Sequence, residues 1–276
     1  MMSIQFADGR EFSLEKPRIM GIINCTPDSF ALRSTTPEIA ITDAQKMITE
    51  GADLLDIGGE STRPGAEPVT VEEEIQRVIP VISAIREFSD IPISVDTNKA
   101  AVAGKALETG ADIINDISAL RFDSAMAAVV AAGRVPVVLM HMKGIPRTMQ
   151  EKPYYDDVLS EIADFFEERM AFAEDNKIAR DKIILDVGIG FGKRLIDNLT
   201  LLKNLSYFKK YGRPLLAGAS RKKFIGDITG REVRERLNGS LAAAALAVSN
   251  GADIVRVHDV ASSKDAVAVA AAMREV

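Results

Sequence analysis

The amino-acid sequence predicts a (β/α)8 TIM barrel preceded by an N-terminal β-hairpin, all within one domain spanning residues 1–276. Eight short runs rich in Ile, Val and Leu alternate with longer helical patterns, which is typical of parallel strands buried on both faces. The length suits one such barrel, and no Ser/Gly/Pro-rich linker divides the chain. The alternative is an open doubly wound sheet. It is disfavoured because no Gly-x-Gly-x-x-Gly turn follows the first strand.

The first element is a hairpin, because residues 4–14 alternate apolar and polar on both sides of an Asp-Gly pair. We expect residues 1–15 to cap the N-terminal mouth of the barrel. The barrel strands are expected at 19–24, 54–57, 93–96, 113–115, 135–140, 183–187, 215–219 and 254–258. Helices are clearest at 70–88 and 156–176. Gly-Ala-Asp recurs at 51, 110 and 251, each time before a strand, where Gly suits the end of a helix.

Composition restricts the function. The 40 acidic and 34 basic residues leave a net charge of -6 without a Lys/Arg block, which argues against nucleic-acid binding. One cysteine, Cys25, excludes an internal disulfide, and two histidines make a protein-only metal cage improbable. Apolar runs are too short for a membrane helix and the start lacks a signal pattern. We therefore expect a soluble, cytoplasmic protein with no membrane partner.

Polar residues end nearly every predicted strand, and such barrels carry their active site at the C-terminal ends of the strands. Singly, each of these residues is more often a turn former, but together they predict a polar pocket above an apolar core. They are Asn24, Asp56, Asp96, Asn115, Asp116, His141, Asp186, Ser220 and His258.

The last strand places Arg256 and His258 on one face, because side chains alternate along a strand. An Arg and a His directed into a pocket suggest that it binds an anion, most simply a phosphate. The alternative is a structural salt bridge from Arg256 to a pocket carboxylate such as Asp186. Asp96 and Asp186 could serve acid–base chemistry or accept hydrogen bonds from a ligand rich in N–H groups.

Several loops follow these strands. Residues 186–193 (DVGIGFGK) form a glycine-rich turn that could let a flat ligand approach the backbone, and the basic turn at 220–223 follows the seventh strand, where barrels commonly bind phosphate. In that turn, Lys222 is the least expected to be merely solvated. Long loops at 26–36 and 58–65 could close over a substrate. No base is evident beside Ser220, and Cys25 is expected to be buried and inert.

Taken together, these motifs resemble the dihydropteroate synthase family over nearly the whole chain. The shared motifs are residues 22–30 (IINCTPDSF), 56–65 (DIGGESTRPG), 94–97 (SVDT), 140–144 (MHMKG), 146–150 (PRTMQ), 220–222 (SRK) and 256–258 (RVH). The resemblance implies a barrel that is usually dimeric. It also implies a transferase of folate biosynthesis that joins 6-hydroxymethyl-7,8-dihydropterin diphosphate to 4-aminobenzoate, releasing diphosphate.

The resemblance also implies roles for individual residues. The pterin pocket would comprise Asp96, Asn115, Met140, Asp186, Gly218 and Lys222, with Arg256 stacked on the ring and reaching the diphosphate. Asn24 and His258 would contact the diphosphate, and Asn24 would also bind Mg²⁺. The 4-aminobenzoate subsite would comprise Thr62, Arg63, Pro64, Phe191 and Ser220. The residues implied in catalysis are Asn24, Arg63, Arg256 and His258.

One departure from the family pattern motivates an alternative. Leu32 stands where the family has an Asp in its first loop, so a non-catalytic pterin-binding paralogue is the second hypothesis. A methyltransferase that moves a methyl group from methyltetrahydrofolate to a corrinoid is the third. It would not need the basic turn at 220–222 or the loop at 61–65.

Overall fold

The computed structural model describes residues 2–26, 36–63 and 65–274. Eight parallel strands close into a barrel in chain order, with the last strand beside the first, so the predicted barrel is confirmed. Every predicted strand is present, with ends displaced by at most two residues. The strands are β3 (Arg18–Asn24), β4 (Leu54–Gly58), β5 (Ile93–Asp96), β6 (Ile113–Asp116), β7 (Val137–Met140), β8 (Ile183–Asp186), β9 (Leu215–Ala217) and β10 (Ile254–Val257).

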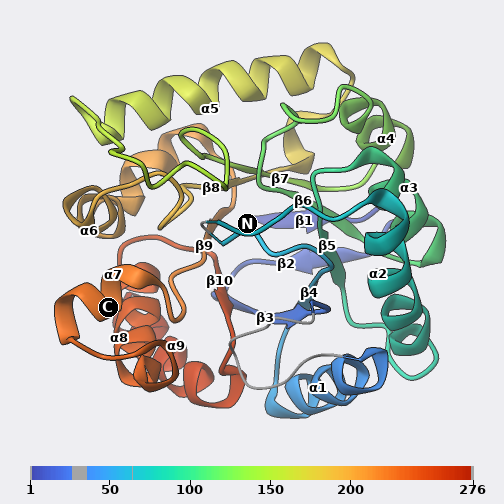
Figure 1. The fold of residues 1–276 in the computed structure, drawn as a ribbon, viewed down its shortest axis with the longest axis horizontal. Coiled ribbons are helices and arrows are strands. Elements are labelled where there is room, and N and C mark those ends of the chain that lie inside the picture. The colour runs from blue at the N-terminus through green and yellow to red at the C-terminus, as the bar shows by residue number, and fades with distance from the viewer. Residues whose placement is uncertain (1, 27–35, 64, 275–276) are drawn as a thin grey trace.

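Helices surround the barrel in chain order (Figure 1) and cover the outer faces of the strands. The two helices predicted most clearly begin at side-chain caps: Thr70 accepts the Glu73 N–H before α2, and Asp157 accepts two N–H groups before α5. The helices are α1 (Pro37–Glu50), α2 (Val71–Arg86), α3 (Ala100–Thr109), α4 (Met126–Gly133), α5 (Val158–Asp175), α6 (Leu195–Lys203), α7 (Lys223–Thr229), α8 (Leu237–Ser249) and α9 (Val260–Arg274). Among the described residues, no helix has both the length and the hydropathy needed to cross a bilayer.

The N-terminal hairpin consists of β1 (Ser3–Gln5) and β2 (Glu11–Ser13), which pair antiparallel. It lies over the middle of the barrel in Figure 1. Its apolar side chains pack against residues near the N-terminal ends of the barrel strands, so the mouth is filled by side chains. The cluster contains Ile4, Phe6 and Leu14 from the hairpin region and Met20, Leu54, Ile113, Val138, Ile184, Leu216 and Ile254 from the strands.

The Gly-Ala-Asp repeat has a structural function at this end of the barrel. Its three glycines have φ angles of +95°, +112° and +115°, which favour Gly. Each aspartate accepts the backbone N–H at the start of the neighbouring strand: Asp53 from Ile19, Asp112 from Ile93 and Asp253 from Leu215, each at 2.8 Å. The repeat therefore joins adjacent strands where they enter the barrel.

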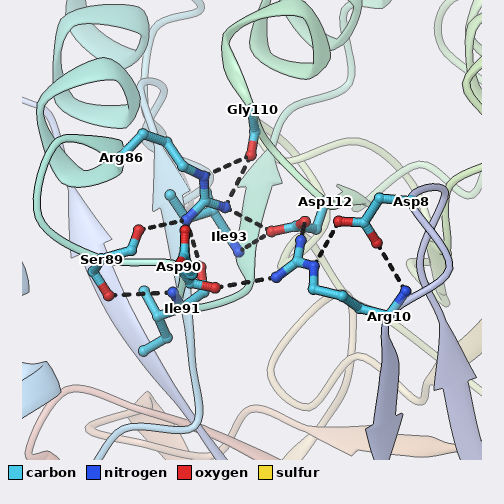
Figure 2. A network of polar contacts seen from close by, with 9 residues as sticks. All are labelled: Asp8, Arg10, Arg86, Ser89, Asp90, Ile91, Ile93, Gly110 and Asp112. Carbon is cyan, nitrogen blue, oxygen red and sulfur yellow. Dashed lines mark hydrogen bonds and ion pairs between the residues drawn. The ribbon is translucent and has the colours of Figure 1, made fainter.

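Asp112 also binds two arginines (Figure 2). Arg86, from the end of α2, donates to its carboxylate at 2.6 Å, while Arg10, from the hairpin, donates to its other oxygen. Arg10 reaches further, to the Asp90 carbonyl at 3.1 Å. This network fastens the hairpin to the barrel at the end opposite the predicted site, so we interpret it as serving stability.

Candidate active site

The strand ends bring the predicted polar residues to one level at the C-terminal end of the barrel. Gly58 lies opposite Asn24 on one side and Asp96 on the other, and Asp96 lies opposite Asn115. Across the barrel, Met140 lies opposite Asp186. These side chains therefore share one end of the barrel, as predicted from the sequence.

Arg256 forms the centre of a buried charge cluster. Its Nε donates to Asp56 Oδ2 at 2.5 Å and its Nη2 donates to Asp96 Oδ2 at 2.7 Å. The salt bridge considered as an alternative thus exists, but its partners are Asp56 and Asp96, not Asp186. Gly218 lies beside the aliphatic part of Arg256: a Cβ there would lie 3.8 Å from Arg256 Cβ and 3.9 Å from its Cδ, at ordinary contact distance. The pairing fixes the orientation of Arg256 without consuming all of its donors.

Sequence reasoning placed Asp56 in the pocket but assigned it no role. It is completely buried, and its Oδ2 also accepts the Asn115 amide at 3.1 Å. Its Oδ1 has no hydrogen-bond partner among the residues the structure describes. One carboxylate therefore orients two predicted pterin ligands and retains an acceptor oxygen, which is the arrangement expected of a positioning residue.

Burial and neighbouring charges shift the protonation equilibria here. Burial raises the pKa of Asp96 to about 7; Arg256 opposes the shift, and Asp56 reinforces it. Burial acts against the charged guanidinium of Arg256, but Asp56 and Asp96 outweigh it and raise its pKa. The arginine therefore remains charged, while the carboxylate next to it can exchange a proton near neutral pH.

Asp186 and Lys222 form the opposite wall of the cluster. Asp186 Oδ1 accepts the Gly188 N–H at 2.8 Å, and a Cβ at Gly188 (φ +66°) would lie 2.0 Å from the His141 carbonyl. Burial raises the pKa of Asp186, an effect that Lys222 opposes. Burial likewise lowers the pKa of Lys222 to about 8, and its ammonium donates to the Ile189 carbonyl. The site thus contains fixed acceptors beside a fixed donor.

The glycine-rich turn presents Phe191 to this wall. The Lys222 ammonium lies 4.3 Å from the centre of the Phe191 ring, which packs against a cluster that includes Met140. Buried Lys193 supports the turn from behind, donating to the Phe191 carbonyl at 3.0 Å and contacting His141 Nδ1 at 2.9 Å. His141, predicted at a strand end, is therefore part of the support for this turn.

Ser220 and His258 contact each other directly. His258 Nδ1 lies 3.0 Å from Ser220 Oγ, which also accepts the His258 backbone N–H at 3.3 Å. The expectation that Ser220 has no base beside it is therefore wrong, because closure of the barrel places the ends of the last two strands together. Burial, followed by Arg256 and Arg221, lowers the pKa of His258 to about 3, so its imidazole is neutral at physiological pH.

The remaining predictions fall into three groups. Thr62 and Arg63 are half-buried in the loop after β4, and the charge of Arg63 reaches His258; Pro64 and Leu32 lie outside the described residues. In the basic turn, Arg221 is bound to Asp259 and Lys223 to Asp227, so only Lys222 joins the site. Cys25 is buried, and burial raises the pKa of its thiol to about 12, as expected for an inert cysteine.

Known proteins share both the sequence and the shape of this chain. The sequence profile of the pterin binding enzyme family matches residues 20–258. Dihydropteroate synthase of Escherichia coli K12 is 48% identical over 266 residues, covering 96% of this chain and 94% of its own. A Yersinia pestis dihydropteroate synthase in complex with a sulfonamide drug superimposes with a TM-score of 0.96 at 42% identity, over the full length of both chains. The Xanthomonas albilineans enzyme in complex with 7,8-dihydropteroate does so with a TM-score of 0.88 at 43% identity, again over both full chains. The chain therefore belongs to the pterin-binding enzymes and, within them, to the dihydropteroate synthase family.

Proposed function

We propose that this chain is a dihydropteroate synthase and that residues 1–276 act as one pterin-binding domain. The reaction joins 6-hydroxymethyl-7,8-dihydropterin diphosphate to 4-aminobenzoate and releases diphosphate. The observation that carries the proposal is the cluster of buried carboxylates and cations at the C-terminal end of the barrel, with Arg256 held between Asp56 and Asp96. A relative that covers the full chain binds 7,8-dihydropteroate, the product of this reaction.

The carboxylates suit the pterin ring. Its guanidine-like edge presents N–H donors, which match the acceptor oxygens of Asp96 and Asp186, and its carbonyl matches the donors of Asn115 and Lys222. Burial makes these matches selective, because a ligand lacking the donors would leave desolvated acceptors unpaired. Met140 and Gly218 would bound the same pocket, and Arg256 would stack on the ring face.

The diphosphate would lie beyond the ring, at Arg256, His258 and Asn24. His258 is neutral, so its ring N–H would donate to a phosphate oxygen while Ser220 binds Nδ1. Among the described residues, no group of three or more His, Cys, Asp or Glu side chains could hold a metal ion. The single amide oxygen of Asn24 nevertheless suits Mg²⁺, which usually takes its other ligands from water and substrate phosphates. Bound there, Mg²⁺ would supply Lewis-acid stabilisation of the leaving diphosphate.

The protein's own part in catalysis is to stabilise charge and position the two substrates. The C–O bond between the pterin methylene and the diphosphate breaks with its electron pair leaving on diphosphate, whose growing charge Arg256 and His258 stabilise. The pterin ring delocalises the methylene cation, and the amine of 4-aminobenzoate attacks it and then loses a proton to solvent. Thr62, Arg63, Pro64, Phe191 and Ser220 would hold the amine substrate in place. This reaction needs no strong nucleophile, in agreement with a chain that has two histidines and one cysteine.

We also infer a homodimer and a cytoplasmic location from the family resemblance. An apolar groove between α6, α7 and α8 supports the dimer, because it leaves large side chains facing solvent. Ile228 and Leu246 line this groove and are each more than half exposed. A second copy of the same chain would cover these side chains in a self-complementary contact.

The test of the proposed activity is a coupled assay of diphosphate release with purified protein, both substrates and Mg²⁺. Turnover that disappears when either substrate is omitted is the expected result, and no release above the buffer rate would reject the activity. Calorimetry with a non-reactive pterin separates the alternatives, because tight binding without turnover would identify a non-catalytic pterin-binding paralogue. The Leu32→Asp variant, assayed in parallel, measures what the missing family aspartate contributes.

A further inference from the structure

A second group of buried charges lies behind the loop that carries Thr62 and Arg63. Lys99, at the start of α3, donates to the carboxylates of both Glu60 and Glu74. The exposed fractions of these side chains are 17% for Lys99, 14% for Glu60 and 1% for Glu74. No substrate role assigned above uses this cluster. Removing three charges from water costs free energy, so the arrangement needs an explanation.

Glu60 connects the two ends of the loop. It stands at the start of the loop, after Gly59, and its carboxylate accepts the backbone N–H of Val69 at the other end, at 3.3 Å. Arg77 strengthens the same base by donating to the Gly59 carbonyl at 2.8 Å. The Glu60 carboxylate therefore bridges the two ends of the loop between residues 60 and 69. We call this contact of Glu60 with Val69 and Lys99 the clasp.

The packing around Gly59 shows how closely this base fits α2. A Cβ at Gly59 would lie 2.8 Å from both Glu74 Cγ and Val78 Cγ2. Glu74 Oε1 has no hydrogen-bond partner among the described residues, so its carboxylate depends on Lys99 for compensation. The loop base, α2 and α3 consequently form one rigid unit, from which the segment carrying Thr62 and Arg63 projects.

We propose that Glu60 and Lys99 are positioning residues that fix the base of the loop and so determine how tightly the enzyme binds its aryl-amine substrate. This inference rests on the proposed function, because it takes Thr62 and Arg63 as contacts of 4-aminobenzoate. A rigid base holds Thr62 and Arg63 in place before the substrate binds, so less conformational entropy is lost on binding. The pterin pocket is built on strand ends and needs no such loop.

The test compares Glu60→Gln, Lys99→Met and the double variant with Lys105→Met as a matched control. Lys105 lies on the same helix as Lys99 but forms an exposed pair with Glu108. We expect the KM for 4-aminobenzoate to rise about tenfold in both single variants, and the double variant to be no worse than the worse single variant, as for residues acting as one unit. The KM for the pterin substrate should stay within about twofold, as should both values in the control.

Hydrogen exchange gives a second measurement that does not depend on turnover. The Val69 amide and its neighbours should exchange faster in Glu60→Gln and Lys99→Met than in the wild type and the control. Unchanged exchange and an unchanged KM for 4-aminobenzoate in folded variants would overturn the proposal, and so would equal increases in the two KM values. A wild type without turnover would reject the proposed function instead, and the exchange rates would still decide whether the clasp exists. Glu60→Gln alone suffices if Lys99→Met does not fold.

Discussion

Replacing Asp56 with asparagine tests whether activity depends on the orientation of Arg256 and not only on its presence. The substitution preserves shape but removes the charge that receives Arg256 Nε at 2.5 Å and the Asn115 amide at 3.1 Å. A hydrogen bond to a charged group contributes about 1.5–3 kcal/mol, and breaking a buried ion pair outright costs about 3–5 kcal/mol. Arg256 keeps its bond to Asp96, and Asp96 loses a repulsive neighbour, so we expect a loss of about 2 kcal/mol in the free energy of unfolding.

The effect of Asp56→Asn on catalysis should be larger than its effect on stability. Two pterin ligands lose their common anchor, and misplacement of catalytic groups by about 1 Å can cost a hundredfold in rate, so we expect kcat/KM to fall by about 10–100-fold. Urea unfolding and steady-state kinetics measure the two effects. Asp227→Asn, which removes the partner of exposed Lys223, is the control, and both quantities should be nearly unchanged. A folded Asp56→Asn variant with kcat/KM within about twofold of wild type would refute the positioning role.

Four other measurements test the remaining assignments. Arg256→Ala should lower kcat/KM by about a hundredfold and Lys223→Ala by less than about twofold, so equal losses would contradict the pocket. Because the pKa of Asp96 is raised to about 7, its carboxylate is mostly ionised above pH 7 and mostly protonated below it. Pterin affinity should therefore fall below pH 7, and pterin binding at pH 6 should release a proton that calorimetry detects. Asp96→Asn should abolish both effects. Asp112→Ala should lower the free energy of unfolding by about 3 kcal/mol in urea denaturation while KM stays constant, since its two arginines lie at the opposite end of the barrel. Leu246→Asp should yield monomers in analytical ultracentrifugation, and an unchanged dimer would place the interface elsewhere.

The fold was predictable because parallel strands buried on both faces form uninterrupted apolar runs. All eight runs became strands, and Asn24, Asp96 and Asp186 occupy the last position of theirs. The strand boundaries were less exact. The predicted strand at 135–140 begins at Val137 in the structure, because Pro136 lacks the N–H group that a central strand position requires.

The side-chain pairings were harder to predict, although two signals existed. Ser220 and His258 follow the seventh and eighth strands, which are neighbours in any closed barrel, so their contact follows from the fold. Asp56, Asn115 and Arg256 lie on the second, fourth and eighth strands, and alternate strands contribute side chains to one layer of such a barrel. The clasp at Glu60 offered no comparable signal, because its partners come from a loop end and two helices.

The charges of the site suggest why so few histidines and cysteines suffice. Asp56, Asp96 and Asp186 face Arg256 and Lys222, so the fully charged cluster has one more carboxylate than cations. Burial relieves part of this imbalance by raising the pKa of Asp96, which keeps a proton available to be displaced when the N–H donors of a pterin arrive. The acceptor oxygens are thus arranged before the substrate binds, and Arg256 is the cation assigned to the leaving group. Preorganised charge of this kind can lower the barrier to a dissociative displacement without a nucleophile from the protein, because the substrate itself supplies both the leaving group and the stabilised cation.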